Sequence, residues 1–318
     1  MMLEDWNANV AAITIILTMP GLIINICCST HFYKRMFDSG GRVLIPYLIA
    51  FSQTSLDCSI ALALIISNLG FFLIFSSGTS LRPVYCLLTR GCLFDLCLGM
   101  RAVTNLVIAV FNYIKLLYPF TTSPLPFKKL VLAISLSTLA ISSLPIIRDI
   151  TQLKPGNTKG CVSLDVRITK EHALLVLGHL SYLYIFIYLY LLPACGIVYL
   201  YKITMSTLIK GQGEERNGDE TESNMERNVV HLVLIELEKT LMLDGYMMII
   251  FFAPVFAGDF YTKYFRAAFG GNSDIDLHRT QISRIIASMY STFYVFFSLA
   301  HRRVYRGAAG ELTLFLSC

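Results

Sequence analysis

Seven long apolar stretches constrain the fold of this chain more than any other feature of its sequence. They run over 10–33, 43–75, 84–117, 129–147, 173–208, 229–257 and 280–300. A helix needs roughly 20 apolar residues to cross a bilayer, and 55% of the 318 residues are hydrophobic while only 15% are charged. The sequence therefore predicts an all-α, multi-pass membrane protein, a bundle of seven transmembrane helices in a lipid bilayer.

Lysine and arginine in the short loops predict the orientation of the bundle, because cytoplasmic loops carry an excess of both. One side carries Lys34, Arg35, Arg42, Lys115, Lys128, Lys129, Lys202, Lys210, Arg216, Arg227, Arg302, Arg303 and Arg306. On the other side the N-terminus carries no lysine or arginine, and the 76–83 loop carries only Arg82. The longer loops 148–171 and 258–279 of that side carry about as many lysines and arginines as the loops on the first side. We expect the N-terminus outside and the C-terminus inside.

The rest of the chain is short and polar. We expect one transmembrane domain over 1–306 and a short cytoplasmic tail over 307–318, whose Cys318 could be acylated. About nine residues precede the first span, which is therefore expected to act as its own targeting signal. The net charge of +5 reflects topology and lipid contact, because binding to nucleic acid would need a basic soluble face.

Two of the nine cysteines lie on the predicted outer side of the membrane. Most of the others fall within spans, where a buried thiol behaves as a small apolar residue. Cys86 lies at the outer start of the third span and Cys161 in the polar loop that follows the fourth. Both face the oxidising compartment, where disulfides persist. We predict a Cys86–Cys161 disulfide, with Cys92 as the competing partner for Cys161.

Six of the predicted spans carry polar, glycine or proline residues at characteristic spacings. They are Gly21 and Asn25 in the first span, Asp57 in the second, Tyr113, Leu116, Pro119 and Phe120 at the end of the third, Pro193 and Tyr201 in the fifth, Pro254 in the sixth and Tyr294 in the seventh. Taken in this order, the set resembles the rhodopsin-like family of G-protein-coupled receptors, from residue 10 to about residue 306.

The resemblance implies a receptor of the plasma membrane with a possible short amphipathic eighth helix. Such a protein is not an enzyme and needs no cofactor or metal. It binds an extracellular ligand among its helices and signals to a heterotrimeric G protein in the cytoplasm. The residues implied to face the G protein are Asn112, Tyr113, Leu116, Pro119, Phe120, Tyr201 and Tyr294. The class of ligand stays open.

The third span departs from the family at its most specific motif. Phe111 stands where the family has an acid, and Asn112 where it has an arginine. In the family that charged pair holds the resting state. The seventh span also lacks the family's Asn-Pro before Tyr294. We therefore expect this chain to keep the docking loop but to lose the charged switch, so that its coupling to a G protein is weak or biased.

Five ionisable side chains fall inside predicted spans: Asp57, Asp95, Arg101, Asp244 and Arg284. Each costs at least ~2.5–3.5 kcal/mol on insertion scales, so each calls for a partner or a function. In the family the second-span aspartate helps to bind sodium with polar groups of the third span. Arg101 occupies one of those positions, and we predict that it pairs with Asp57 and displaces the ion. The alternative is that Arg101 lines a wet cavity unpaired, which is costly for a buried charge.

The resemblance places the ligand pocket at Asp95, Phe252 and Arg284. Phe252 occupies the aromatic switch position before the sixth-span proline. Arg284 occupies the place of the retinal lysine in opsins, although a guanidinium is not a usable amine nucleophile. Asp95 lies one position past the ligand-binding acid of amine receptors, which rotates its side chain by about 100°. A pair between Asp95 and Arg284 is therefore as well supported as ligand contact.

Asp244 lies in the sixth span, ten residues before its proline, in a turn that is normally apolar in the family. The third span should pack here near Asn105, and an amide can hydrogen-bond a carboxyl in either protonation state. We expect Asp244 and Asn105 to hold the resting state, as part of an intramembrane polar switch with Asn25, Asp57 and Arg101. The alternative is that Asp244 faces lipid headgroups.

A transporter or channel is the main competing function, because intramembrane charges also mark ion pathways. The odd number of spans and the absence of an internal sequence repeat weigh against it. A membrane enzyme would need a convergent set of catalytic or metal-binding residues, whereas the six histidines are scattered along the chain.

The predicted Cys86–Cys161 disulfide can be tested by peptide mapping without reduction. In the chain-entropy model, closing a loop of this length stabilises the fold by ~4–5 kcal/mol. We expect a single linked peptide pair that contains both residues. Free thiols at both positions, or a Cys92–Cys161 pair, would contradict the prediction.

Overall fold

The computed structural model of the chain describes residues 2–37, 44–76, 92–117, 136, 183–184, 186–214, 231–260, 273–302 and 304–308, and nearly all of these residues are helical. No strand occurs among these residues. The helices are α1 (Met2–Arg35), α2 (Ile45–Ser76), α4 (Cys92–Leu117), η2 (Phe186–Leu191), α8 (Leu192–Glu214), η3 (Leu241–Tyr246), α10 (Met247–Phe260) and α12 (Ser273–His301). Residues 231–240 are also helical and lead directly into η3.

Five helical segments are long and apolar enough to cross a membrane: Asn9–Arg35, Pro46–Leu69, Leu93–Ile114, Phe186–Lys210 and His231–Gly258. They match the first, second, third, fifth and sixth predicted spans, and they mark a multi-pass membrane protein. The apolar part of α12, Ile285–His301, is shorter. The predicted fourth span lies outside the described residues except for residue 136.

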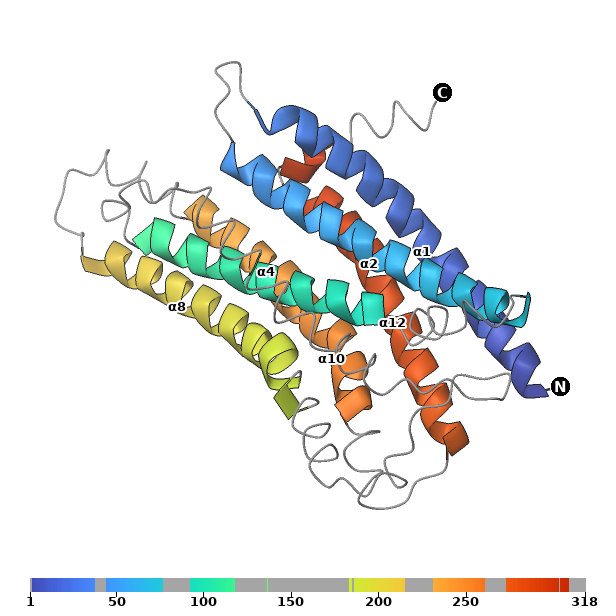
Figure 1. Ribbon diagram of the computed structural model, residues 1–318. Helices are drawn as coiled ribbons and strands as arrows, with labels where there is room; N and C mark the ends of the chain where they lie inside the picture. The colour runs from blue at the N-terminus through green and yellow to red at the C-terminus, as the bar shows by residue number, and fades with distance from the viewer. Residues whose placement is uncertain are drawn as a thin grey trace.

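The described helices run side by side as a bundle (Figure 1), and their contacts close a ring of neighbours. α1 packs on α2 and α12, α2 packs on α4, and α4 packs on α8. The segment made of η3 and α10 closes the ring between α8 and α12. A polar side chain that points into the ring therefore meets side chains from several other helices.

Apolar packing holds the ring at two places. The larger cluster fills the interior between α4, α8, α10 and α12, and includes Leu98, Ile197 and Phe252. The smaller cluster lies at the C-terminal end of α1, where the rings of Phe32 and Tyr305 meet with centroids 4.8 Å apart. This contact anchors the short helical segment 304–308 on α1, beyond the end of α12.

A glycine allows the closest approach between α1 and α12. A Cβ atom on Gly21 would lie 2.3 Å from the Thr292 hydroxyl oxygen and 2.9 Å from the Thr292 Cα. The same two helices are joined by Asn25 Nδ2, which donates to the Ser291 carbonyl at 3.2 Å, and by the Thr292 hydroxyl, which donates to the Leu17 carbonyl at 3.2 Å. Small residues at helix crossings of this kind let membrane helices pack closely.

Replacing Gly21 with alanine should separate α1 from α12. Overpacking of a tight contact costs ~1–3 kcal/mol, which exceeds the ~1 kcal/mol that alanine gains over glycine as a helix former. We expect Gly21→Ala to lower the melting temperature of the detergent-purified protein. The matched control is Gly258→Ala, because a Cβ there would meet nothing within 4 Å. Equal melting temperatures for the two variants would contradict the packing argument.

Candidate functional site

The centre of the ring holds a buried ion pair between α2 and α4. Arg101 Nε donates to Asp57 Oδ1 at 2.8 Å, and both side chains are fully buried. The predicted pairing of these two residues is confirmed, and the alternative of an unpaired Arg101 is not what the structure shows. Because each charge is neutralised by the other, neither is left alone in the interior, where it would be costly.

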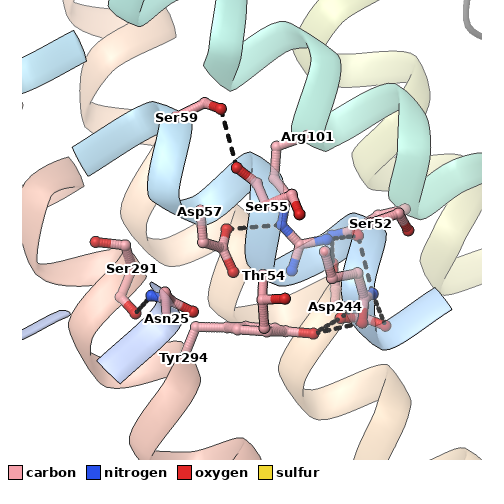
Figure 2. Close-up of polar contacts among 12 residues, drawn as sticks. Asn25, Ser52, Thr54, Ser55, Asp57, Ser59, Arg101, Asp244, Ser291 and Tyr294 are labelled. Carbon is pink, nitrogen blue, oxygen red and sulfur yellow. Dashed lines mark hydrogen bonds and ion pairs between the residues drawn. The ribbon is translucent and has the colours of Figure 1, made fainter. Parts of the chain in front are cut away.

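Arg101 makes two further kinds of contact. Its Nη1 donates to Asn105 Oδ1, one helical turn further along α4. Its guanidinium carbon lies 4.6 Å from the centroid of the Tyr294 ring and 5.9 Å from that of Tyr290. Figure 2 shows the guanidinium group beside the Tyr294 ring, with Asp57 on one side and Asp244 on the other. Aromatic faces attract a cation in this way, so α12 also helps to hold the charge.

A second buried ion pair lies nearby, between η3 and the residue that follows α12. Arg302 Nη2 donates to Asp244 Oδ2 at 2.8 Å. Asp244 is 1% exposed and Arg302 is 8% exposed. The alternative in which Asp244 faces lipid headgroups is therefore wrong.

Gln53 and Tyr294 join this second pair to α2 and α12. The Gln53 side-chain amide donates to Asp244 Oδ2 at 3.2 Å, and its carbonyl accepts from Arg302 Nη1 at 2.9 Å. The Tyr294 hydroxyl donates to Asp244 Oδ1 at 2.7 Å. Gln53 Nε2 also lies 3.3 Å from Asn105 Oδ1, which links the two ion pairs into one network. Asp244 has polar partners on α2 and α12 besides Arg302, whereas among the described residues the Asp57 carboxylate is bound by Arg101 alone.

The local helix geometry helps to place Asp244 in this network. Asp244 belongs to η3, a π-helical segment within the longer helical run. An extra residue in a turn shifts the register of the side chains around the axis, and such bulges are frequent at functional sites. The neighbouring Gly245 faces α8, where a Cβ atom on this residue would lie 3.4 Å from Ile197 Cγ2.

Arg302 comes from just beyond the apolar part of α12. Its backbone N–H still donates to the Ser298 carbonyl at 2.9 Å, and its own carbonyl accepts from the Arg306 N–H at 3.1 Å. Burial lowers the pKa of Arg302, but the Asp244 carboxylate, together with Tyr294 and Tyr305, leaves that pKa well above its ordinary value. The guanidinium is therefore charged at any physiological pH.

The structure refines the expected contact between Asn105 and Asp244. Asn105 Nδ2 donates to the backbone carbonyl of Asp244 at 3.4 Å. The carboxylate instead accepts from Arg302, Gln53 and Tyr294. A guanidinium is the stronger partner for a buried carboxylate because it adds charge to the hydrogen bond. Asn25, the remaining member of the expected polar switch, lies apart from this network and joins α1 to α12.

The residues expected to face a cytoplasmic partner are only partly accessible. Asn112 Nδ2 donates to the Tyr201 hydroxyl at 3.1 Å, which ties α4 to α8. Tyr201 is 1% exposed and Tyr294 is fully buried, because their rings pack in the core and their hydroxyls find partners there. Tyr113 is partly buried. The side chain of Leu116, and Pro119 and Phe120 altogether, lie outside the described residues.

The residues expected to bind ligand do not form a described site. Phe252 is fully buried, and its ring meets that of Tyr290 edge to face, with centroids 4.7 Å apart. Asp95 lies in the first turn of α4, where the helix dipole favours an acid. Arg284 belongs to α12, but its side chain lies outside the described residues, as do Cys86 and Cys161. Among the described residues, no group of three or more His, Cys, Asp and Glu could hold a metal ion.

Sequence reasoning missed two members of the network, Gln53 and Arg302. Gln53 lies four residues before Asp57, and Arg302 eight residues after Tyr294. Both spacings place two side chains on one helical face, which is a signal that could have identified them. The distribution of lysine and arginine instead predicts that Arg302 is one of the cytoplasmic basic residues.

No protein-family model matches this chain, and no curated protein matches it. The features of this chain that bear on its function are therefore the polar network and the order of the sequence motifs.

Breaking the Asp57–Arg101 pair should be costly, whereas removing it entirely should not be. Loss of one partner of a buried pair typically costs ~3–5 kcal/mol, while apolar replacement of both partners is often neutral. We expect Asp57→Leu and Arg101→Leu each to lower folded surface expression, and the double variant to recover it. Ser59→Leu is the control, because Ser59 is exposed on the same helix. Strictly additive losses would contradict a direct pair.

Proposed function

We propose that this chain is a divergent rhodopsin-like G-protein-coupled receptor of the plasma membrane. It would have seven spans, the N-terminus outside and a short helix after the last span. An extracellular ligand would bind between the outer halves of the helices, and a heterotrimeric G protein would bind at the cytoplasmic end. The opposite orientation would place the basic loops outside, against the distribution of lysine and arginine.

One observation carries the proposal: polar residues of the second, third, sixth and seventh predicted spans meet in one buried network. Asp57, Arg101, Asp244 and Tyr294 come from four separate helices and lie at or near positions that the sequence resemblance singles out. Buried polar groups inside membrane helices are rare and usually functional. A network that joins four helices suits a protein whose helices move relative to one another between two states.

The cytoplasmic end supports coupling without the family's charged motif. Asn112 makes a neutral hydrogen bond to Tyr201 where the family has an arginine. A neutral contact of this kind contributes only about 0.6–2 kcal/mol in a membrane. We therefore propose that Asn112 and Tyr201 are released together when the cytoplasmic ends of the helices separate, and that coupling is weaker than in receptors with the arginine.

A transporter or channel remains the second candidate, because two buried ion pairs lie in one network inside the helix bundle. The two functions are separated by experiment. A ligand screen that reads second messengers in cells should find ligand-dependent G-protein activation if the chain is a receptor. Substrate or ion flux in proteoliposomes, without any G-protein activation, would favour the transporter instead.

Restoring the arginine should strengthen coupling. We expect Asn112→Arg to raise basal or ligand-driven G-protein activation several-fold, because a charged side chain that favours one of two states shifts their populations. The matched control is Asn112→Gln, which keeps an uncharged amide and should behave like the native chain. Equal activity for all three chains, at equal surface expression, would show that position 112 does not contact a G protein.

A further inference from the structure

The Asp244–Arg302 pair differs from the other buried pair in where its partners lie along the chain. Asp57 and Arg101 both lie within spanning helices, whereas Arg302 follows the last residue of α12 and is anchored near the segment 304–308. The pair therefore connects one spanning helix to the point where the chain leaves the membrane.

The polar contacts of Asp244 all tend to hold its helix inside the ring. Its carboxylate accepts from Gln53 of α2, from Tyr294 of α12 and from Arg302. A movement of the 231–246 segment away from α2 and α12 would break the ion pair and these hydrogen bonds together. The segment's other described neighbours are α8, with apolar contacts at Gly245, and α4, where Asn105 Nδ2 donates to the Asp244 carbonyl at 3.4 Å. These apolar and uncharged contacts resist separation less than a charged pair does.

The segment that carries Arg302 is held in place from the other side. Tyr305 packs edge to face on Phe32 of α1, and the Arg302 guanidinium carbon lies 6.0 Å from the Tyr305 ring centroid. The segment that carries Arg302 is therefore packed on α1, while the Arg302 side chain forms an ion pair with Asp244 of η3. The ion pair thus joins the 231–246 segment, which would move, to the end of α12, which is held on α1.

A buried pair of this kind is suited to switching rather than to net stability. Replacement of both partners is often neutral, whereas loss of one partner is strongly unfavourable. Arg302 Nε makes no hydrogen bond to any described residue, so the pair is incompletely satisfied. The other pair also has atoms without a hydrogen bond to a described residue, Asp57 Oδ2 and Arg101 Nη2, so what distinguishes the Asp244–Arg302 pair is its position at the end of α12.

We propose that Asp244 and Arg302 form a conformational lock that holds the cytoplasmic part of the 231–260 helix against α2 and α12. The lock takes the place of a charged contact at Phe111 and Asn112. A role of the lock in signalling rests on the proposed receptor function. The existence of the lock does not depend on that function. Release would free the 231–246 segment to move outward and would leave Arg302 available to an acidic or carbonyl-bearing partner.

Hydrogen–deuterium exchange of the full chain in lipid nanodiscs tests the lock without ligand or G protein. The variants are Asp244→Asn, Arg302→Gln and the double variant, with Arg306→Gln as the control because Arg306 is exposed one turn further on. We expect each single variant to speed exchange of the 231–240 amides roughly tenfold, which corresponds to about 1.4 kcal/mol. The double variant should exchange as fast as the single variants and no faster, and the control should match the native chain.

Each other outcome overturns the proposal. Native exchange in Arg302→Gln, or additive effects in the double variant, would show that the two side chains do not hold the helix together. If the single variants fail to fold, the double variant decides, because it leaves no unpaired charge. A double variant that exchanges like the native chain, or that does not fold, would show that the pair is not a releasable lock. A failure of the receptor proposal would leave these results unchanged.

Discussion

The cost of placing two arginines inside a ring of membrane helices determines how the rest of the structure is arranged. A buried guanidinium needs a carboxylate and several hydrogen-bond acceptors, since the desolvation penalty is otherwise several kcal/mol. Arg101 and Arg302 each have one aspartate, Asp57 and Asp244, at 2.8 Å. Because these partners lie on different helices, the charges set which helix faces meet. Apolar packing then fills the space on either side of the polar layer.

The backbone at η3 and after α12 also brings a buried arginine and its carboxylate together. The π-helical turn at η3 presents Asp244 to the interior, and the backbone continues past α12 so that Arg302 can reach back to it. Neither feature is favoured by helix propensity, because π turns are rare. The two ion pairs are then joined by Gln53, whose amide both donates and accepts, a capacity that no apolar side chain of that size has.

The sequence predicted the parts of this arrangement that depend on helical spacing and hydrophobicity. Runs of apolar residues predicted five of the membrane helices. The Asp57–Arg101 pair was predicted because the two residues occupy positions of the sodium site in the family that the sequence resembles. The second pair was not predicted, because Arg302 lies past the apolar run, where a basic residue ordinarily faces the cytoplasm. The contact of Arg302 with Asp244 depends on where α12 ends and on the packing of Tyr305 against Phe32. Both are tertiary features. The expected exposure of Tyr201 failed for a similar reason, since a hydroxyl partner on α4 allows the whole ring to be buried.

A polar layer in the middle of a membrane bundle has consequences for motion. Apolar surfaces in a membrane gain little by meeting one another, because lipid is equally apolar. Packing between the helices is therefore weakly directional, and a few polar contacts decide which packing is preferred. In this chain those contacts cluster on Asp244, so a change at one carboxylate alters the link between the 231–260 helix and both α2 and α12. A shift of 1–3 kcal/mol there changes a population by about 5–150-fold, which is the typical size of the coupling free energy between two sites of a protein.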